Sequence, residues 1–147
     1  MGTIIANVAK GKFGYYAGLP AANDAIIAIP LLSAGLEADA TLQDYQTVAA
    51  LLAASNDEQT TMGRKTCAAV TNAVDYSANK LTVDFNDITW TAATGSACGK
   101  ILFAYDPDTT TSTDSTRIPL FMDDFVVTPA GGDVTYQVNA SGIADAS

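Results

Sequence analysis

The chain has 147 residues, 48% of them hydrophobic, and its sixteen acidic and seven basic residues give a net charge of −9. A chain of this length can bury roughly two thirds of its unfolded surface in one domain. The sparse lysines and arginines argue against a direct nucleic-acid role, because phosphate binding needs a dense basic patch. The longest apolar run, residues 25–32, is far below the roughly 20 residues of a membrane-spanning helix.

The first 14 residues contain no stable hydrophobic period, which predicts an N-terminal arm that is extended or forms an edge strand. This segment carries Lys10 and Lys12, and Tyr15 and Tyr16 follow it. The two tyrosines are candidate interface anchors because aromatic side chains supply large contact areas. Packing within the domain is the alternative for both. No secretory leader opens the chain, so we expect synthesis in a cytoplasm.

Two segments with different periods come next. Residues 25–32 are continuously apolar and predict a buried strand. In residues 42–54 the spacing of three or four places apolar side chains on one face of a helix, with Asp39 or Thr41 as its N-cap. The side chains on this face are Leu42, Tyr45, Ala49 and Leu52.

The remaining sequence is typical of strands. Leu81, Val83 and Phe85 alternate with polar residues after a turn at 77–79, which predicts a hairpin. The apolar phase then shifts to Ile88 and Trp90, which predicts a bulge or corner at 86–87.

Three later features complete the β pattern. Residues 100–105 are apolar on both faces and predict a central strand, and residues 134–138 alternate as a half-buried strand does. Pro119 predicts that the strand between them lies at an edge or begins irregularly.

These elements predict a mainly β fold, an antiparallel β-sandwich or barrel with one α-helix at about residues 42–54. The predicted organisation is an N-terminal arm (1–14), a single β-rich domain (15–140) and a C-terminal tail (141–147).

Candidate catalytic chemistry is sparse. The chain contains no histidine, which removes the commonest general base and the usual partner of a nucleophilic serine or cysteine. Asp123 and Asp124, with Asp84 or Asp87, could form a glycosidase pair, but adjacent residues of a strand point to opposite faces. We therefore expect a protein that is not an enzyme and that needs no cofactor.

The loop from Asp106 to Asp114 is rich in carboxylates and hydroxyls, which are suitable ligands for calcium. It lacks the central glycine and the terminal glutamate of an EF-hand loop. The alternative is a solvated connection whose side chains bond to their own backbone. Cys67 and Cys98 are interpreted as buried thiols, with a disulfide as the alternative.

Several segments resemble the small structural proteins encoded among the head genes of tailed bacteriophages. The resemblance extends over roughly residues 15–142, and its most distinctive part lies in residues 104–120. The segments that carry it are Tyr-Tyr-Ala-Gly-Leu-Pro-Ala-Ala-Asn-Asp (15–24), Gly-Leu-Glu-Ala-Asp (35–39), Ala-Tyr-Asp-Pro-Asp-Thr-Thr (104–110) and Thr-Asp-Ser-Thr-Arg-Ile-Pro-Leu (113–120).

The resemblance implies a virion component, made in the host bacterial cytoplasm and placed on the capsid exterior as a head-decoration or minor capsid protein. Its partner would be the major capsid protein, and we expect a homo-oligomer, a trimer. The candidate interface residues are Lys10, Lys12, Tyr15, Tyr16, Asp106, Asp108, Asp114 and Arg117.

Two alternatives stay open at the level of sequence. The chain could be a neck or tail protein of the same kind of virion, as a ring or tube subunit. It could also be a glycan-binding or host-surface-binding module, for which Trp90 and the tyrosines supply candidate aromatic contacts.

Overall fold

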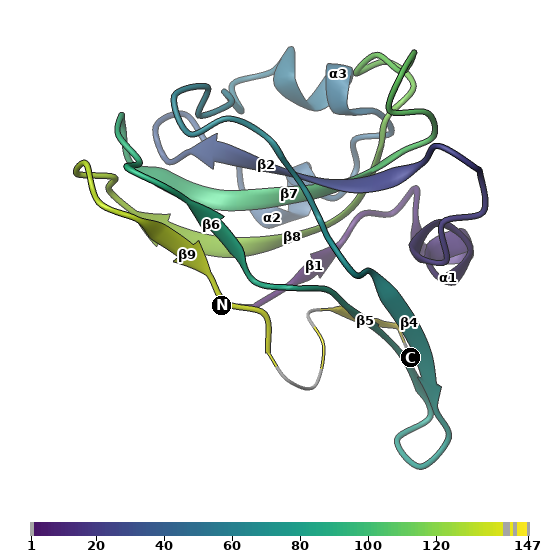
Figure 1. The fold of residues 1–147 in the computed structure, drawn as a ribbon. Helices are drawn as coiled ribbons and strands as arrows, with labels where there is room; N and C mark the ends of the chain where they lie inside the picture. The colour runs from purple at the N-terminus through teal and green to yellow at the C-terminus, as the bar shows by residue number, and fades with distance from the viewer. Residues whose placement is uncertain (1, 140–141, 143, 147) are drawn as a thin grey trace.

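The computed structural model describes residues 2–139, 142 and 144–146. Its largest element is a five-stranded antiparallel sheet with the strand order β1-β8-β7-β2-β3 (Figure 1). These strands are β1 (Ile4–Ile5), β2 (Ala25–Leu32), β3 (Lys65–Thr66), β7 (Cys98–Asp106) and β8 (Ile118–Val127).

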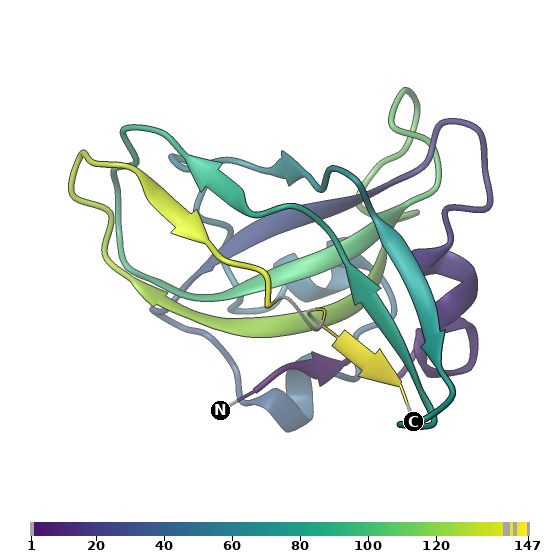
Figure 2. The same cartoon turned by 60° about the horizontal axis from the view of Figure 1, so that its bottom comes forward.

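Two smaller antiparallel sheets pack on one face of the large sheet together with the N-terminal helical turns, and two short helices, residues 39–42 and 48–52, cover the other face (Figures 1 and 2). One small sheet has the order β10-β5-β4 and the other pairs β6 with β9. Their strands are β4 (Thr71–Asp75), β5 (Lys80–Asp84), β6 (Ile88–Trp90), β9 (Val134–Tyr136) and β10 (Ala144–Ala146). The helices are the 3₁₀ turn η1 (Lys10–Lys12), α1 (Phe13–Ala17), α2 (Asp39–Leu42) and α3 (Val48–Leu52). Antiparallel sheets with few helices confirm the predicted mainly β fold.

Strand β7 is central and is buried on both faces, as its continuous apolar run predicts. Ile101, Phe103 and Tyr105 enter the cluster shared with the small sheets. Leu102 and Ala104, on the opposite face, enter the cluster shared with α2 and α3. This division follows from the period of two in a strand, and it gives the molecule two hydrophobic layers around one sheet.

The helix predicted at residues 42–54 is replaced by two shorter helices. Leu42 ends α2, and a new helix begins after Thr47, whose side chain accepts a hydrogen bond from the N–H of Ala50 at 3.1 Å. This cap fixes Thr47 in an extended conformation, which interrupts a continuous helix. Of the predicted face, Leu42 is buried and Tyr45 and Leu52 are partly buried against the same cluster, which also buries Val48 and Leu51 from outside that face.

The N-terminal segment is an edge strand followed by a packed turn. Ile4 and Ile5 pair with Met122 and Phe121 of β8, and Ala6, Ala9 and Phe13 are buried. Of the two sequence alternatives, the edge strand is therefore the one observed. In the predicted tail, residues 144–146 pair with β5, while residues 141, 143 and 147 lie outside the described part of the chain.

The predicted hairpin is formed by β4 and β5 and turns at residues 76–79. The Asp75 carboxylate accepts hydrogen bonds from the N–H groups of Ser77 and Ala78 at 2.9 and 3.0 Å. Asn79 takes a positive φ of 53°, which asparagine tolerates better than most residues. The apolar residues change phase between β5 and β6 because these strands belong to different sheets, so the chain turns a corner at residues 86–87, as predicted.

Strand β8 begins irregularly, which is one of the two outcomes that Pro119 predicts. The register of its pairing with β7 shifts between Phe103 and Ala104, opposite Phe121 and Pro119. The strand nevertheless lies between β1 and β7 rather than at the edge of the sheet.

Cys67 and Cys98 are buried free thiols, so the disulfide alternative is wrong. Burial raises the pKa of the Cys67 thiol to about 12 and also raises the pKa of Cys98. The Cys98 thiol lies 3.5 Å from the Met62 sulfur. Both residues therefore act as small apolar side chains.

Truncation of Phe103 should be among the most destabilising changes in the core. Its ring is fully buried and stacks on Phe121 with centroids 4.6 Å apart. We expect Phe103→Ala to lower the free energy of unfolding by about 3–5 kcal/mol, measured by urea titration. Tyr76→Ala, at an exposed position, should change it by less than about 0.5 kcal/mol. Equal losses in the two variants would contradict this description of the core.

Candidate interaction site

Four of the candidate interface residues gather around η1 and α1. Lys10 and Lys12 are exposed, Tyr15 is 61% exposed and Tyr16 is half-buried. The first three of them line an open depression of about 480 Å³, called the α1 depression below. Its lining consists of residues 10–15 and Leu81 of β5.

The two tyrosines of α1 have different roles. The Tyr16 ring lies 4.9 Å from the ring of Tyr105, whose hydroxyl donates a hydrogen bond to Asp24 at 2.8 Å. Burial and this carboxylate both raise the pKa of Tyr105. Tyr16 is therefore a packing residue that attaches α1 to the end of β7. Tyr15 contacts Tyr16 edge-on and presents most of its surface to solvent.

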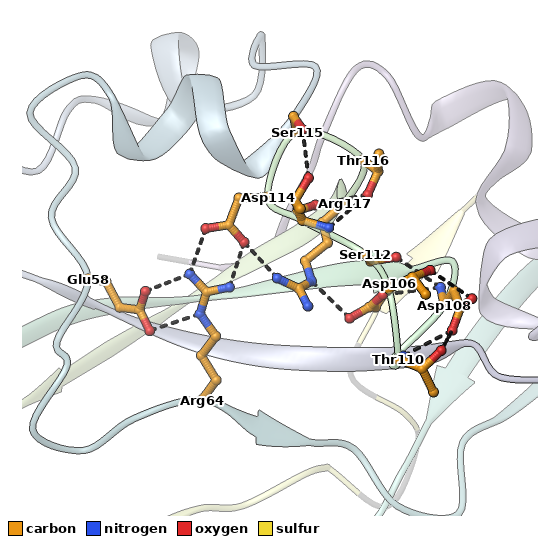
Figure 3. Close-up of polar contacts among 12 residues, drawn as sticks. Glu58, Arg64, Asp106, Asp108, Thr110, Ser112, Asp114, Ser115, Thr116 and Arg117 are labelled. Atoms are coloured by element: carbon orange, nitrogen blue, oxygen red, sulfur yellow. Dashed lines mark hydrogen bonds and ion pairs between the residues drawn. The ribbon is translucent and has the colours of Figure 1, made fainter.

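The other four candidates are Asp106, at the end of β7, and three residues of the loop between β7 and β8, and ion pairs connect three of the four (Figure 3). Arg117 donates to Asp106 at 2.8 Å and to Asp114 at 2.9 Å. Arg64 donates to Asp114 at 2.6 and 2.9 Å and makes a second bidentate pair with Glu58, at 2.9 and 2.7 Å. Two guanidinium groups thus join three carboxylates from separate parts of the chain.

Backbone hydrogen bonds also fix this loop against α3. The backbone N–H groups of Val48 and Ala49 donate to the carbonyl oxygens of Arg117 and Asp114 at 3.1 and 2.9 Å. The first turn of a helix leaves such N–H groups without partners inside the helix, so the loop completes this end of α3. The loop is consequently held in a defined shape by its own chain.

The calcium alternative finds no ligand set in this loop. The described residues contain no group of three or more acidic or cysteine side chains arranged to hold a metal ion. Asp106 is 2% exposed and bonded to Arg117, while Asp108 accepts hydrogen bonds from the loop residues Thr110 and Thr111. The side chains bond within the loop, as the alternative of a solvated connection predicts.

The carboxylates considered for glycoside hydrolysis are separated by the sheet. Asp123 accepts a hydrogen bond from the Tyr136 hydroxyl at 2.7 Å, whereas Asp124 pairs with Lys100 on the other face of β8. Asp84 and Asp87 accept hydrogen bonds from the backbone N–H groups of Phe85 and Val138. Each carboxylate thus has a structural partner, and the opposite orientation of Asp123 and Asp124 confirms the strand prediction.

Trp90 does not form a sugar-binding platform. Its side chain is 2% exposed, and its indole N–H donates to the Gly63 carbonyl oxygen at 2.9 Å. Of the aromatic residues that the glycan-binding alternative invokes, Trp90 is therefore inside the core, whereas Tyr15 is exposed.

The β4–β5 hairpin is an exposed feature that the sequence did not single out as a site. Every residue from 71 to 79 is exposed, and the hairpin projects beyond the body of the molecule (Figure 1). Val74 and Tyr76 are 54% and 86% exposed. β4 is the edge strand of its sheet within the described residues. The position of Val74 and Tyr76 in the hairpin was predictable, but their exposure depends on what packs across the sheet.

Comparison with protein families, characterised proteins and solved structures finds no match to this chain. Among the described residues, no helix is both long enough and apolar enough to cross a membrane.

Loss of the Asp114 charge should weaken the protein mainly at neutral pH. Hydrogen bonds from Arg64, and then from Arg117, lower the pKa of Asp114 to about 2. The ionised carboxylate therefore stabilises the fold fully above about pH 4, and this contribution is lost as the pH falls toward 2. We expect Asp114→Asn to cost about 1–2 kcal/mol at pH 7 and much less at pH 2.5, measured by urea unfolding. Asp57→Asn makes the same charge change at an exposed position and should have little effect. A loss for Asp114→Asn that does not depend on pH would rule out the electrostatic explanation.

Proposed function

We propose that this chain is a structural subunit of a virion, a head-decoration or minor capsid protein that binds and stabilises the major capsid shell. On this proposal it acts by docking on protein subunits at the capsid exterior and not by catalysis. The virion part of the proposal rests on the resemblance to tailed-phage head proteins that we infer from the sequence, chiefly at residues 15–24 and 104–120.

The observation that carries the docking part of the proposal is the projecting β4–β5 hairpin. The nine residues 71–79 are all exposed, so this part of the chain adds little to the domain's own core. An open edge strand with exposed apolar side chains favours association with another chain. Strand pairing removes its free backbone N–H and C=O groups from water, and the contact buries its apolar side chains. Val74 and Tyr76 are the apolar side chains that such a contact would bury.

The stiff loop between β7 and β8 is a second feature suited to docking. Its ion pairs with Arg64 and its backbone contacts with α3 fix its shape before any partner binds. A preorganised surface loses less conformational entropy on binding. On a symmetric shell, many copies of a modest interface can together add substantial stability.

Particles that lack this chain provide the direct test. We expect such heads to release DNA at a lower temperature, or more readily at low ionic strength, than complete heads, measured by dye accessibility during heating. Addition of the purified chain to the deficient heads should return their release temperature to that of complete heads. Equal release from both kinds of particle would contradict a stabilising role.

The number of copies per particle separates the two virion positions. Hundreds of copies per particle would fit the head, whereas six or twelve would indicate a ring in the neck or tail.

The hairpin contact can be tested with a matched pair of variants. Tyr76 and Val126 are each 86% exposed, and Tyr76 lies at the hairpin turn whereas Val126 lies near the end of β8. We expect Tyr76→Ser to weaken binding to chain-deficient heads by about tenfold or more, because aromatic side chains often dominate protein interfaces. Both variants should keep the free energy of unfolding within about 0.5 kcal/mol. If only Val126→Ser weakened binding, the docking surface would lie at the end of β8 instead.

A further inference from the structure

The geometry points to a specific ligand class for the α1 depression: an acidic segment of the partner protein. Carboxylates of this segment would pair with Lys10 and Lys12, and one of its apolar side chains would cover Leu81. The inference rests on the proposed function, because it assigns the chemistry of the capsid surface that this chain would bind.

The floor of the α1 depression is apolar and continues onto the hairpin. Leu81 lies directly across from Val74 in the pairing of β5 with β4, so the two side chains are neighbours on one face of the sheet. Val74 is 54% exposed, and Tyr15, also in the lining, is 61% exposed. A partner's apolar side chain would therefore remove a continuous apolar surface from water.

The wall of the depression is fixed in place by close backbone packing. A Cβ atom at Gly14 would lie 2.8 Å from a Leu81 methyl group, so glycine allows α1 to approach β5 this closely. The Asn72 side-chain amide donates to the Gly14 carbonyl oxygen at 2.9 Å and joins α1 to β4. The helix and the hairpin therefore form one preorganised surface.

The lysines of the depression are available for a partner. Within the part of the chain that the structure describes, no carboxylate forms an ion pair with Lys10 or Lys12. Arg64, Lys100 and Arg117, by contrast, each hold carboxylates of their own chain. In a chain with a net charge of −9, two exposed lysines beside an apolar floor are complementary to carboxylates.

A protein segment fits this surface better than nucleic acid. Two lysines would neutralise few phosphates, and the net negative charge of the chain would repel the remainder of the polymer. The apolar floor also has no use in phosphate binding, whereas it suits a segment in which acidic and apolar residues are mixed.

The test measures binding of purified variants to nuclease-treated heads that lack this chain, by co-sedimentation at several salt concentrations. Lys10→Glu, Lys12→Glu and the double variant are compared with Lys65→Glu, which changes the charge equally on β3. We expect the double variant to bind at least about tenfold more weakly at low salt. Wild-type binding should weaken as salt rises, and this dependence should decrease in the double variant. Lys10→Arg with Lys12→Arg should retain binding, because the positive charges remain.

The outcomes separate the inference from the function on which it rests. If wild type binds the heads and charge reversal has no greater effect than Lys65→Glu, the inference is overturned and the proposed function stands. If wild type binds neither untreated nor nuclease-treated heads, both fall. If wild type associates with itself and charge reversal abolishes this association, the occupant is a second copy of this chain. If wild type binds untreated heads but not the nuclease-treated ones, nucleic acid is the ligand instead.

Discussion

Burial of β7 on both faces is the constraint that organises this molecule. Its alternate side chains enter two clusters, one shared with the small sheets and the other with α2 and α3. Phe103 stacks on Phe121 in the first cluster, and Leu102 packs in the second with Leu42 and Leu51. Because each outer layer buries its apolar side chains against this sheet, neither would have a core without it.

Ion pairs then fix the parts of the chain that the apolar clusters hold less firmly. Lys100, in β7, reaches Asp39 of α2 at 2.9 Å and also pairs with Asp124. Arg64 and Arg117 attach the loop between β7 and β8 to the segment that contains Glu58. These partly buried pairs connect residues distant in the sequence, so they specify position as well as adding stability.

The structure also distinguishes charged side chains that are bonded within the chain from surfaces that remain exposed to solvent. The acidic loop residues mostly bond within their own chain, although the sequence places them beside the other interface candidates. The lysines of η1, Tyr15 and the β4–β5 hairpin retain exposed charge and apolar surface. On the proposed function, these are the surfaces that would contact another subunit.

The sequence by itself determined the mainly β class, the central strand and the hairpin, because a period of two and local turn chemistry depend on neighbouring residues. It could not show that Thr47 divides the predicted helix, or that Asp114 would meet Arg64 fifty positions away. It also left Tyr15 and Tyr16 equivalent, whereas the fold packs the half-buried Tyr16 against Tyr105 and leaves Tyr15 exposed. Tertiary structure decided these points, since burial and ion pairing depend on which distant segments the fold brings into contact.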